Sequence, residues 1–189
     1  MTLVIGDITV SLDGFVDGPD DGVEAIHAWA LRSDDPVDRG VLERHVAASG
    51  AVVMGRRTFD DVDRGWSDGM GYGATVDARP PFVVVTSSPP AEHRLAATHT
   101  FTFVTDGPAT AIRRARAAAG DRDVFVMGGG ALVGSCLRDG LLDELRLHLA
   151  PEVLGGGTPL STGAGRQQLQ QASVEVSRTC THLTYRGRR

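Results

Sequence analysis

The stretch that decides the fold is Phe125-Val126-Met127-Gly128-Gly129-Gly130-Ala131-Leu132-Val133, in which a short apolar run leads directly into three glycines. A continuous apolar run of this length is typical of a strand buried on both faces of a sheet. Glycine lets the backbone approach a ligand closely, and a helix that begins here offers N–H groups to an anion such as a pyrophosphate. The purely structural alternative is a sharp strand-to-helix turn that binds no ligand. The pattern is neither GxGxxG nor a P-loop, because no Gly-Lys-Ser/Thr follows.

Similar patterns extend outward from this stretch in both directions. Buried strands are predicted at 3–10, 51–54, 82–86 and 123–127, with a weaker alternating run at 100–104. Helices are predicted between them at 37–48, 108–119 and 131–139. This alternation predicts an α/β fold, with a mixed, mostly parallel central sheet flanked by helices. The C-terminal runs 144–150, 174–179 and 182–186 predict antiparallel edge strands added to that sheet.

Local signals set the boundaries within this plan. Asp35 is expected to cap the helix that starts at Pro36, and Gly50 is expected to stop it. The polar, Gly-rich stretch 65–81 predicts a long, mobile surface loop. No repeat or long linker divides the chain, so residues 1–189 are expected to form one domain.

Three further junctions place polar or cationic groups where a predicted strand ends. Gly55-Arg56-Arg57-Thr58 follows one strand, and two guanidiniums with a hydroxyl suit phosphate groups. Thr86-Ser87 follows the next, and Asp13-Gly14 follows the first. The plain interpretation of each is a turn or a solvated helix start. In a parallel sheet, however, all of them gather along one edge with the triple glycine, which predicts a dinucleotide site there.

Composition excludes several other classes. The net charge is -5 and the basic residues are scattered, so no nucleic acid is expected as a partner. No apolar run approaches the length of a membrane span and the N-terminus is not a signal peptide, so a cytoplasmic protein with no membrane contact is predicted. The two cysteines, Cys136 and Cys180, are expected to be buried free thiols.

No metal site is predicted. His45, His93, His99, His148 and His182 are isolated in the sequence and receive no role. The acidic residues at 17, 20, 21 and 24 lack the spacing of a calcium loop and are expected to be solvated.

The segments Ser-Leu-Asp-Gly-Phe, Met-Gly-Arg-Arg-Thr-Phe, Val-Val-Val-Thr-Ser and Val-Met-Gly-Gly-Gly-Ala-Leu, in this order, resemble the dihydrofolate reductase superfamily. The resemblance is closest to the reductase domain of the riboflavin-biosynthesis deaminase–reductase, and it covers nearly the whole chain. It implies hydride transfer from NADPH to a small pteridine- or pyrimidine-like heterocycle or to a carbonyl substrate. No deaminase with its zinc signature precedes the domain in this sequence.

The same resemblance implies a role for each matched residue. Asp13, beside the nicotinamide and the substrate, is the one candidate catalytic residue. Thr86 and Ser87 would lie near the adenosine 2′-phosphate, with Arg56 or Arg57 favouring NADPH over NADH. The candidate cofactor-binding residues are Gly55, Arg56, Arg57, Thr58, Thr86, Ser87, Gly128, Gly129, Gly130, Ala131 and Leu132.

One departure from the family keeps other functions open. Dihydrofolate reductases carry a carboxylate on the first helix, three residues before a tryptophan, and with Trp29 as that tryptophan the position is Ile26. Without an obvious proton donor, a non-catalytic nucleotide-binding or sensing module is the main alternative, and a true dihydrofolate reductase is disfavoured. The branch often pairs, so a homodimer is expected, with strand 144–150 and its Pro-Gly-rich extension as the interface.

Overall fold

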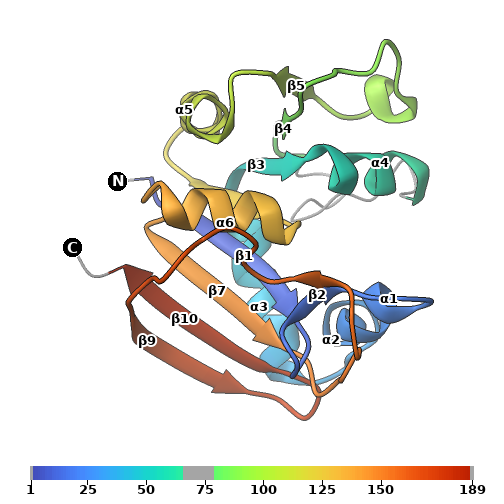
Figure 1. Ribbon diagram of the computed structural model, residues 1–189, viewed down its shortest axis with the longest axis vertical. Coiled ribbons are helices and arrows are strands. Elements are labelled where there is room, and N and C mark those ends of the chain that lie inside the picture. The colour runs from blue at the N-terminus through green and yellow to red at the C-terminus, as the bar shows by residue number, and fades with distance from the viewer. Residues whose placement is uncertain (1, 66–78, 188–189) are drawn as a thin grey trace.

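An eight-stranded sheet forms the centre of the molecule in the computed structural model, which describes residues 2–65 and 79–187. Its strand order is β5-β4-β3-β6-β1-β7-β10-β9 (Figure 1). The first six strands in this order are mutually parallel, and β10 and β9 are antiparallel additions. The strands are β1 (Val4–Val10), β3 (Ser49–Gly55), β4 (Phe82–Val85), β5 (Phe101–Val104), β6 (Asp123–Met127), β7 (Glu144–Leu149), β9 (Leu169–Val176) and β10 (Thr181–Gly187).

Helices cover both faces of this sheet. One face carries α5 (Pro108–Ala119) and α6 (Gly130–Arg138), and the other carries α3 (Pro36–Ala48) and α4 (Arg56–Gly65). In Figure 1, α6 crosses in front of β1 while α3 lies behind it. The smaller elements are the helices α1 (Gly22–Ile26), α2 (Ala28–Leu31) and η1 (Arg94–Ala97), and a two-stranded sheet of β2 (Phe15–Asp17) and β8 (Thr158–Pro159).

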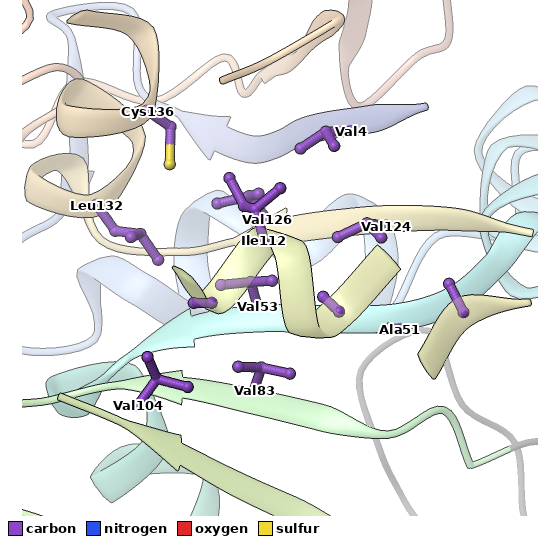
Figure 2. Packing of buried hydrophobic residues seen from close by; sticks show 13 residues of the cluster. Val4, Ala51, Val53, Val83, Val104, Ile112, Val124, Val126, Leu132 and Cys136 are labelled. Atoms are coloured by element: carbon purple, nitrogen blue, oxygen red, sulfur yellow. The ribbon is translucent and has the colours of Figure 1, made fainter. Parts of the chain in front are cut away.

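Alternate residues of the central strands point to opposite faces, which produces two apolar cores. Beneath α5 and α6, Val53 and Val126 meet Ile112 and Cys136 (Figure 2). On the other face, strand residues such as Met54 pack with Phe59 of α4. Because the central strands are buried on both sides, their sequences are continuous apolar runs, as predicted. Full burial of each such side chain contributes about 1.5–3 kcal/mol to folding.

Helix α3 begins as its sequence predicts. The Asp35 carboxylate accepts a hydrogen bond from the Val37 backbone N–H at 2.9 Å, and Pro36 occupies the first turn. Its end differs from the prediction, because Gly50 lies in β3 rather than at the helix terminus. A Cβ on Gly50 would lie 2.6 Å from the Ala119 carbonyl oxygen, so this glycine is required by close packing against the end of α5.

The C-terminal strands also correct the prediction. β7 is parallel to β1 and antiparallel to β10, and it lies between them, so it continues the parallel part of the sheet and is not an edge strand. β9 covers Leu169–Val176 rather than 174–179. The residues after it form a tight turn, in which the Ser177 N–H donates to the Cys180 carbonyl at 2.9 Å.

The remaining predictions for the fold have mixed outcomes. Cys136 and Cys180 are both buried and free, as expected. The predicted loop 65–81 falls largely on residues 66–78, which lie outside the described residues. Among the helices of the described segments, none is both long and apolar enough to cross a membrane.

Candidate cofactor site at the carboxyl ends of the parallel strands

The sheet brings the predicted junctions together along one edge. Strands β4, β3, β6 and β1 are neighbours in this order and all run the same way, so the residues that follow them meet at their carboxyl ends. The register aligns Gly55 with Val85, and Met127 with both Met54 and Asp7. Open α/β sheets bind ligands at this edge.

The triple glycine forms the centre of the edge. Gly128 and Gly129 have φ of 64° and 78°, a region that side chains other than glycine rarely adopt. A Cβ on Gly130 would lie 1.8 Å from the carbonyl oxygen of Pro159 in β8. The turn therefore presents the first N–H groups of α6 towards the edge, with Gly129 at the N-cap and no side-chain cap. Gly130 itself is explained by packing against β8, without any ligand.

The start of α4 supplies two guanidiniums beside this turn. Arg56 donates to the Asp60 carboxylate at 2.7 Å and to the Ser88 carbonyl. Arg57 donates to the Asp17 carboxylate at 2.5 Å, and its side chain is 75% exposed. Thr58 lies against Gly128, since a Cβ built on that glycine would be 3.0 Å from the Thr58 Oγ1. The guanidiniums are thus held in place by neighbours from β2 and from the turn after β4.

Four of the predicted cofactor residues have different surroundings. Thr86 is buried, and its Oγ1 accepts from the Ser88 N–H at 3.1 Å, so it shapes the turn after β4. Ser87 is exposed at the tip of that turn. The Leu132 side chain packs into the core beneath α6, and its backbone N–H donates to the Gly129 carbonyl at 3.1 Å. Ala131 is exposed in the first turn of α6.

Asp13 is exposed and joins two loops. Its carboxylate accepts from the Ser11 hydroxyl at 2.6 Å and from the backbone N–H groups of Leu154 and Gly155 at 3.1 and 2.7 Å. The hydrogen bond from Ser11, with those from the two N–H groups, holds the pKa of this carboxyl below its usual range. Asp13 is therefore an ionised acceptor that fastens the loop after β7 to the end of β1. Contact of Asp13 with a substrate stays a prediction.

A buried polar cluster lies on the α3 face of the sheet, and it overturns the interpretation of the histidines as isolated. The Nε2 atoms of His45 in α3 and His148 in β7 both face the Asp7 carboxylate of β1, at 2.8 Å and at 3.3–3.4 Å. The Nδ1 of His148 lies 2.7 Å from the Nδ1 of His182 in β10. Trp29 packs against His148 with ring centroids 4.3 Å apart.

Helix α3 also carries a second buried carboxylate of this cluster, which the sequence prediction did not single out. Asp38 is fully buried, and it accepts from His182 Nε2 at 2.8 Å and from the hydroxyls of Ser33 and Thr179. Ile26 lies in α1 and Trp29 in α2, so the position three residues before Trp29 carries no carboxylate, as the sequence indicated. The signal that could have found Asp38 is its place just after Pro36, in the first turn of the helix that covers the sheet.

Burial and hydrogen bonding set the charges in this cluster. Burial opposes the ionisation of Asp7, but the imidazoles of His45 and His148 hold its pKa well below the usual value. Burial also opposes the ionisation of Asp38, yet the hydrogen bonds from Ser33, Thr179 and His182 lower its pKa. Burial lowers the pKa of His148, which favours its neutral form. Two carboxylates are therefore ionised inside the protein.

The fold and the edge site together define a class of protein. A mostly parallel sheet with helices on both faces, two antiparallel strands at one side and a glycine turn at the carboxyl edge is the architecture of dihydrofolate reductase-like proteins. A dihydrofolate reductase from Enterococcus faecalis, solved with NADP(H), has this fold, with a TM-score of 0.61 and 12% identity over 98% of this chain and 96% of that one.

Within this class the family is given by the sequence. The model of the RibD C-terminal domain matches residues 2–183, and the chain belongs to that family. A Shewanella sp. PV-4 protein whose name assigns it to riboflavin biosynthesis superimposes over the full length of both chains, with a TM-score of 0.76 and 23% identity.

The chain also resembles part of a larger enzyme. The Thermotoga maritima diaminohydroxyphosphoribosylaminopyrimidine deaminase/5-amino-6-(5-phosphoribosylamino)uracil reductase matches 98% of this chain, with a TM-score of 0.66 and 15% identity. The match spans 56% of the Thermotoga chain. The family thus places the protein among reductase-like domains.

Proposed function

We propose that the protein is an NADPH-dependent reductase that transfers hydride to a small heterocyclic substrate of the pteridine or pyrimidine type, or to a carbonyl compound. The observation that carries the proposal is the convergence of the glycine turn, the start of α6 and the two guanidiniums of α4 at one edge of the sheet. N–H groups at a helix start suit a pyrophosphate, and arginine forks suit an additional phosphate.

Related proteins support both halves of this proposal. The Enterococcus dihydrofolate reductase holds NADP(H) on the same fold, and the Thermotoga enzyme is named as a reductase of a phosphoribosylamino uracil. A pyrimidine-like substrate is the choice that agrees with membership in the RibD C-terminal domain family. The two free, buried cysteines agree with a reducing cytoplasm as the place of action.

Each candidate residue has a distinct expected role. The backbone of 128–132 would face the pyrophosphate, while Thr58 supports Gly128 from the neighbouring helix. Arg57 is the more exposed guanidinium, and a 2′-phosphate would compete with Asp17 for it. Arg56 is less exposed, and its bond to the Ser88 carbonyl would fix the turn that holds Thr86 and Ser87.

The direct test is a titration of the purified protein with NADPH and with NADH, followed by fluorescence quenching or calorimetry. We expect NADPH to bind more tightly, and Arg57→Ala to weaken NADPH about tenfold, which corresponds to ~1.4 kcal/mol, while leaving NADH unchanged. Arg114→Ala, which removes an exposed arginine of α5 that is not among the predicted cofactor residues, is the matched control. Equal binding of both nucleotides, or no binding, would contradict the cofactor assignment.

A second candidate function is a nucleotide-binding module without turnover. It is favoured by the state of Asp13, whose carboxylate is ionised and occupied by three donors, and which is therefore a poor source of protons. Loss of the reduced-nicotinamide absorbance upon addition of pterins, pyrimidines or quinones would favour the reductase. Tight NADPH binding with no oxidation by any of these substrates would favour the module.

A homodimer remains part of the proposal, but its interface differs from the one expected. The edge of β7 is occupied by β1 and β10, so it cannot pair with a second chain. β9 is the last strand on that side of the sheet, and it exposes Val174 and Val176. Pairing through the sheet would therefore use β9.

A further inference from the structure

Three side chains of the buried polar cluster have the make-up of a metal site. Asp7, His45 and His148 come from β1, α3 and β7, and one potential ligand atom from each lies within 4.8 Å of the other two. All three residues are buried, at 2%, 7% and 2% exposure. Imidazole nitrogens with a carboxylate oxygen are a donor set that zinc and similar ions bind in proteins.

The separations of His148 from the two Asp7 oxygens agree with a small divalent ion. Bonds of about 2.0–2.2 Å to a tetrahedral ion place neighbouring ligand atoms roughly 3.3–3.6 Å apart. The His148 Nε2 lies 3.3 and 3.4 Å from the two Asp7 oxygens, and the His45 Nε2 lies 2.8 Å from one of them. A small outward movement of the His45 ring would complete the arrangement.

The hydrogen bonds of the histidine pair orient His148 towards Asp7. His182 Nε2 lies 2.8 Å from the Asp38 carboxylate, and the Nδ1 atoms of His148 and His182 lie 2.7 Å apart. With its Nδ1 used by His182, His148 presents Nε2 to Asp7, and this is the nitrogen that can bind an ion.

We propose that Asp7, His45 and His148 bind one divalent transition-metal ion of the size and softness of Zn²⁺. His182 and Asp38 form the second layer, which fixes the tautomer of His148 through its Nδ1–H, as the outer partners of metal-bound histidines do. Three protein donors leave a position on the ion for water or a ligand oxygen. The site is independent of the proposed cofactor edge, since it uses none of the residues assigned there.

Trp29 provides a local probe for the experiment. Its ring lies 4.3 Å from that of His148 and 4.9 Å from that of His182. The sequence contains two tryptophans, so a Trp66→Phe variant leaves Trp29 as the only emitter. Co²⁺ bound to His148 would quench this emission, and Zn²⁺ would reverse the quenching by displacement.

The experiment uses the full chain without an affinity tag, stripped with a chelator and then dialysed against Zn²⁺ or Co²⁺ at micromolar concentration. We expect about one equivalent of bound metal, quenching of Trp29 by Co²⁺, and loss of both in His45→Gln/His148→Gln. The matched control is His93→Gln, which removes an imidazole outside the cluster and should bind as the parent does. His182→Gln should weaken binding roughly 10–100-fold through the tautomer of His148.

Two outcomes would overturn the proposal. Failure of the folded parent protein to bind either metal saturably would leave the cluster as a hydrogen-bond network only. Full binding by the doubly substituted protein would place the ion elsewhere on the chain. The first outcome is measured on the parent protein and needs no variant. For the second, circular dichroism checks that the doubly substituted protein is folded. Both are also separate from the nucleotide titration, which tests the reductase proposal.

Discussion

The carboxyl edge of the sheet and the polar cluster beneath α3 are built in opposite ways. The edge is made of short contiguous segments, such as Gly128-Gly129-Gly130 and Arg56-Arg57-Thr58, each placed directly after its strand. The cluster takes residues from β1, α3, β7 and β10, and the sequence distance between Asp7 and His148 is 141 residues. The edge is open to solvent at Arg57 and Ser87, while the cluster is buried. The residues of a site for a large ligand can thus be neighbours in the sequence, whereas those of a buried charge network are brought together only by the whole fold.

The largest effect is expected from breaking the cluster at Asp38. Asp38→Ala removes the acceptor of His182, Ser33 and Thr179 and leaves their polar groups buried without it. We expect the free energy of unfolding to fall by about 3–5 kcal/mol, because each buried polar group that loses its partner costs about 1–3 kcal/mol. Urea denaturation followed by circular dichroism measures this. Asp34→Ala, at an exposed neighbour in the sequence, should stay within about 0.5 kcal/mol of the parent.

A smaller effect is expected at the glycine turn, and it separates packing from backbone strain. Gly130→Ala places a Cβ against the Pro159 carbonyl and should lower the free energy of unfolding by about 3 kcal/mol. Gly129→Ala has more room but a φ of 78°, so a loss of about 1–2 kcal/mol is expected.

Gly55→Ala is the control for both turn variants, since its Cβ would meet no neighbour within 4 Å and its φ is ordinary. The same denaturation measurement ranks the three. If Gly130→Ala were as stable as Gly55→Ala, the close approach of β8 to the start of α6 would be wrong.

The smallest effect concerns the two thiols. One lies near the glycine turn and the other lies near the polar cluster. Cys136 lies on α6 behind the glycine turn, and Cys180 follows the segment that bonds to Asp38. Burial raises the pKa of both thiols from 9.0 to about 12. Because the folded pKa is raised, the thiols favour the folded state at every pH up to about 9, and this contribution is lost as the pH rises towards 12.

Both thiols should therefore resist a thiol reagent at pH ~8 in the native protein and react in the unfolded one. Asp38→Ala should speed the reaction of Cys180 more than that of Cys136, and Gly130→Ala should do the reverse. Mass spectrometry of the labelled peptides measures each rate. Rapid labelling of either cysteine in the native parent protein would contradict its burial.

Local chemistry explains the parts of the fold that could be predicted. Two kinds of local signal made correct predictions possible. Burial on both faces gives a continuous apolar run, which identified the strands at 82–86 and 123–127, and an Asp-Pro pair identified the start of the helix after Asp35. The strand at 169–176 was predicted at 174–179, because seven of its eight residues are exposed and no apolar pattern marks where it begins. β2 and β8 were missed because they are only three and two residues long.

The sequence by itself determined the parallel sheet, the flanking helices and the edge where the glycine turn meets Arg56 and Arg57, because each strand and the turn after it are adjacent in the chain. Only the tertiary structure decided that β7 lies inside the sheet, that Asp38 faces His182, and that Asp7 meets His45 and His148. The physical reason is that strand order and the packing of α3 bring these residues together across long separations. Such contacts leave no spacing or composition in the sequence that a local pattern can detect.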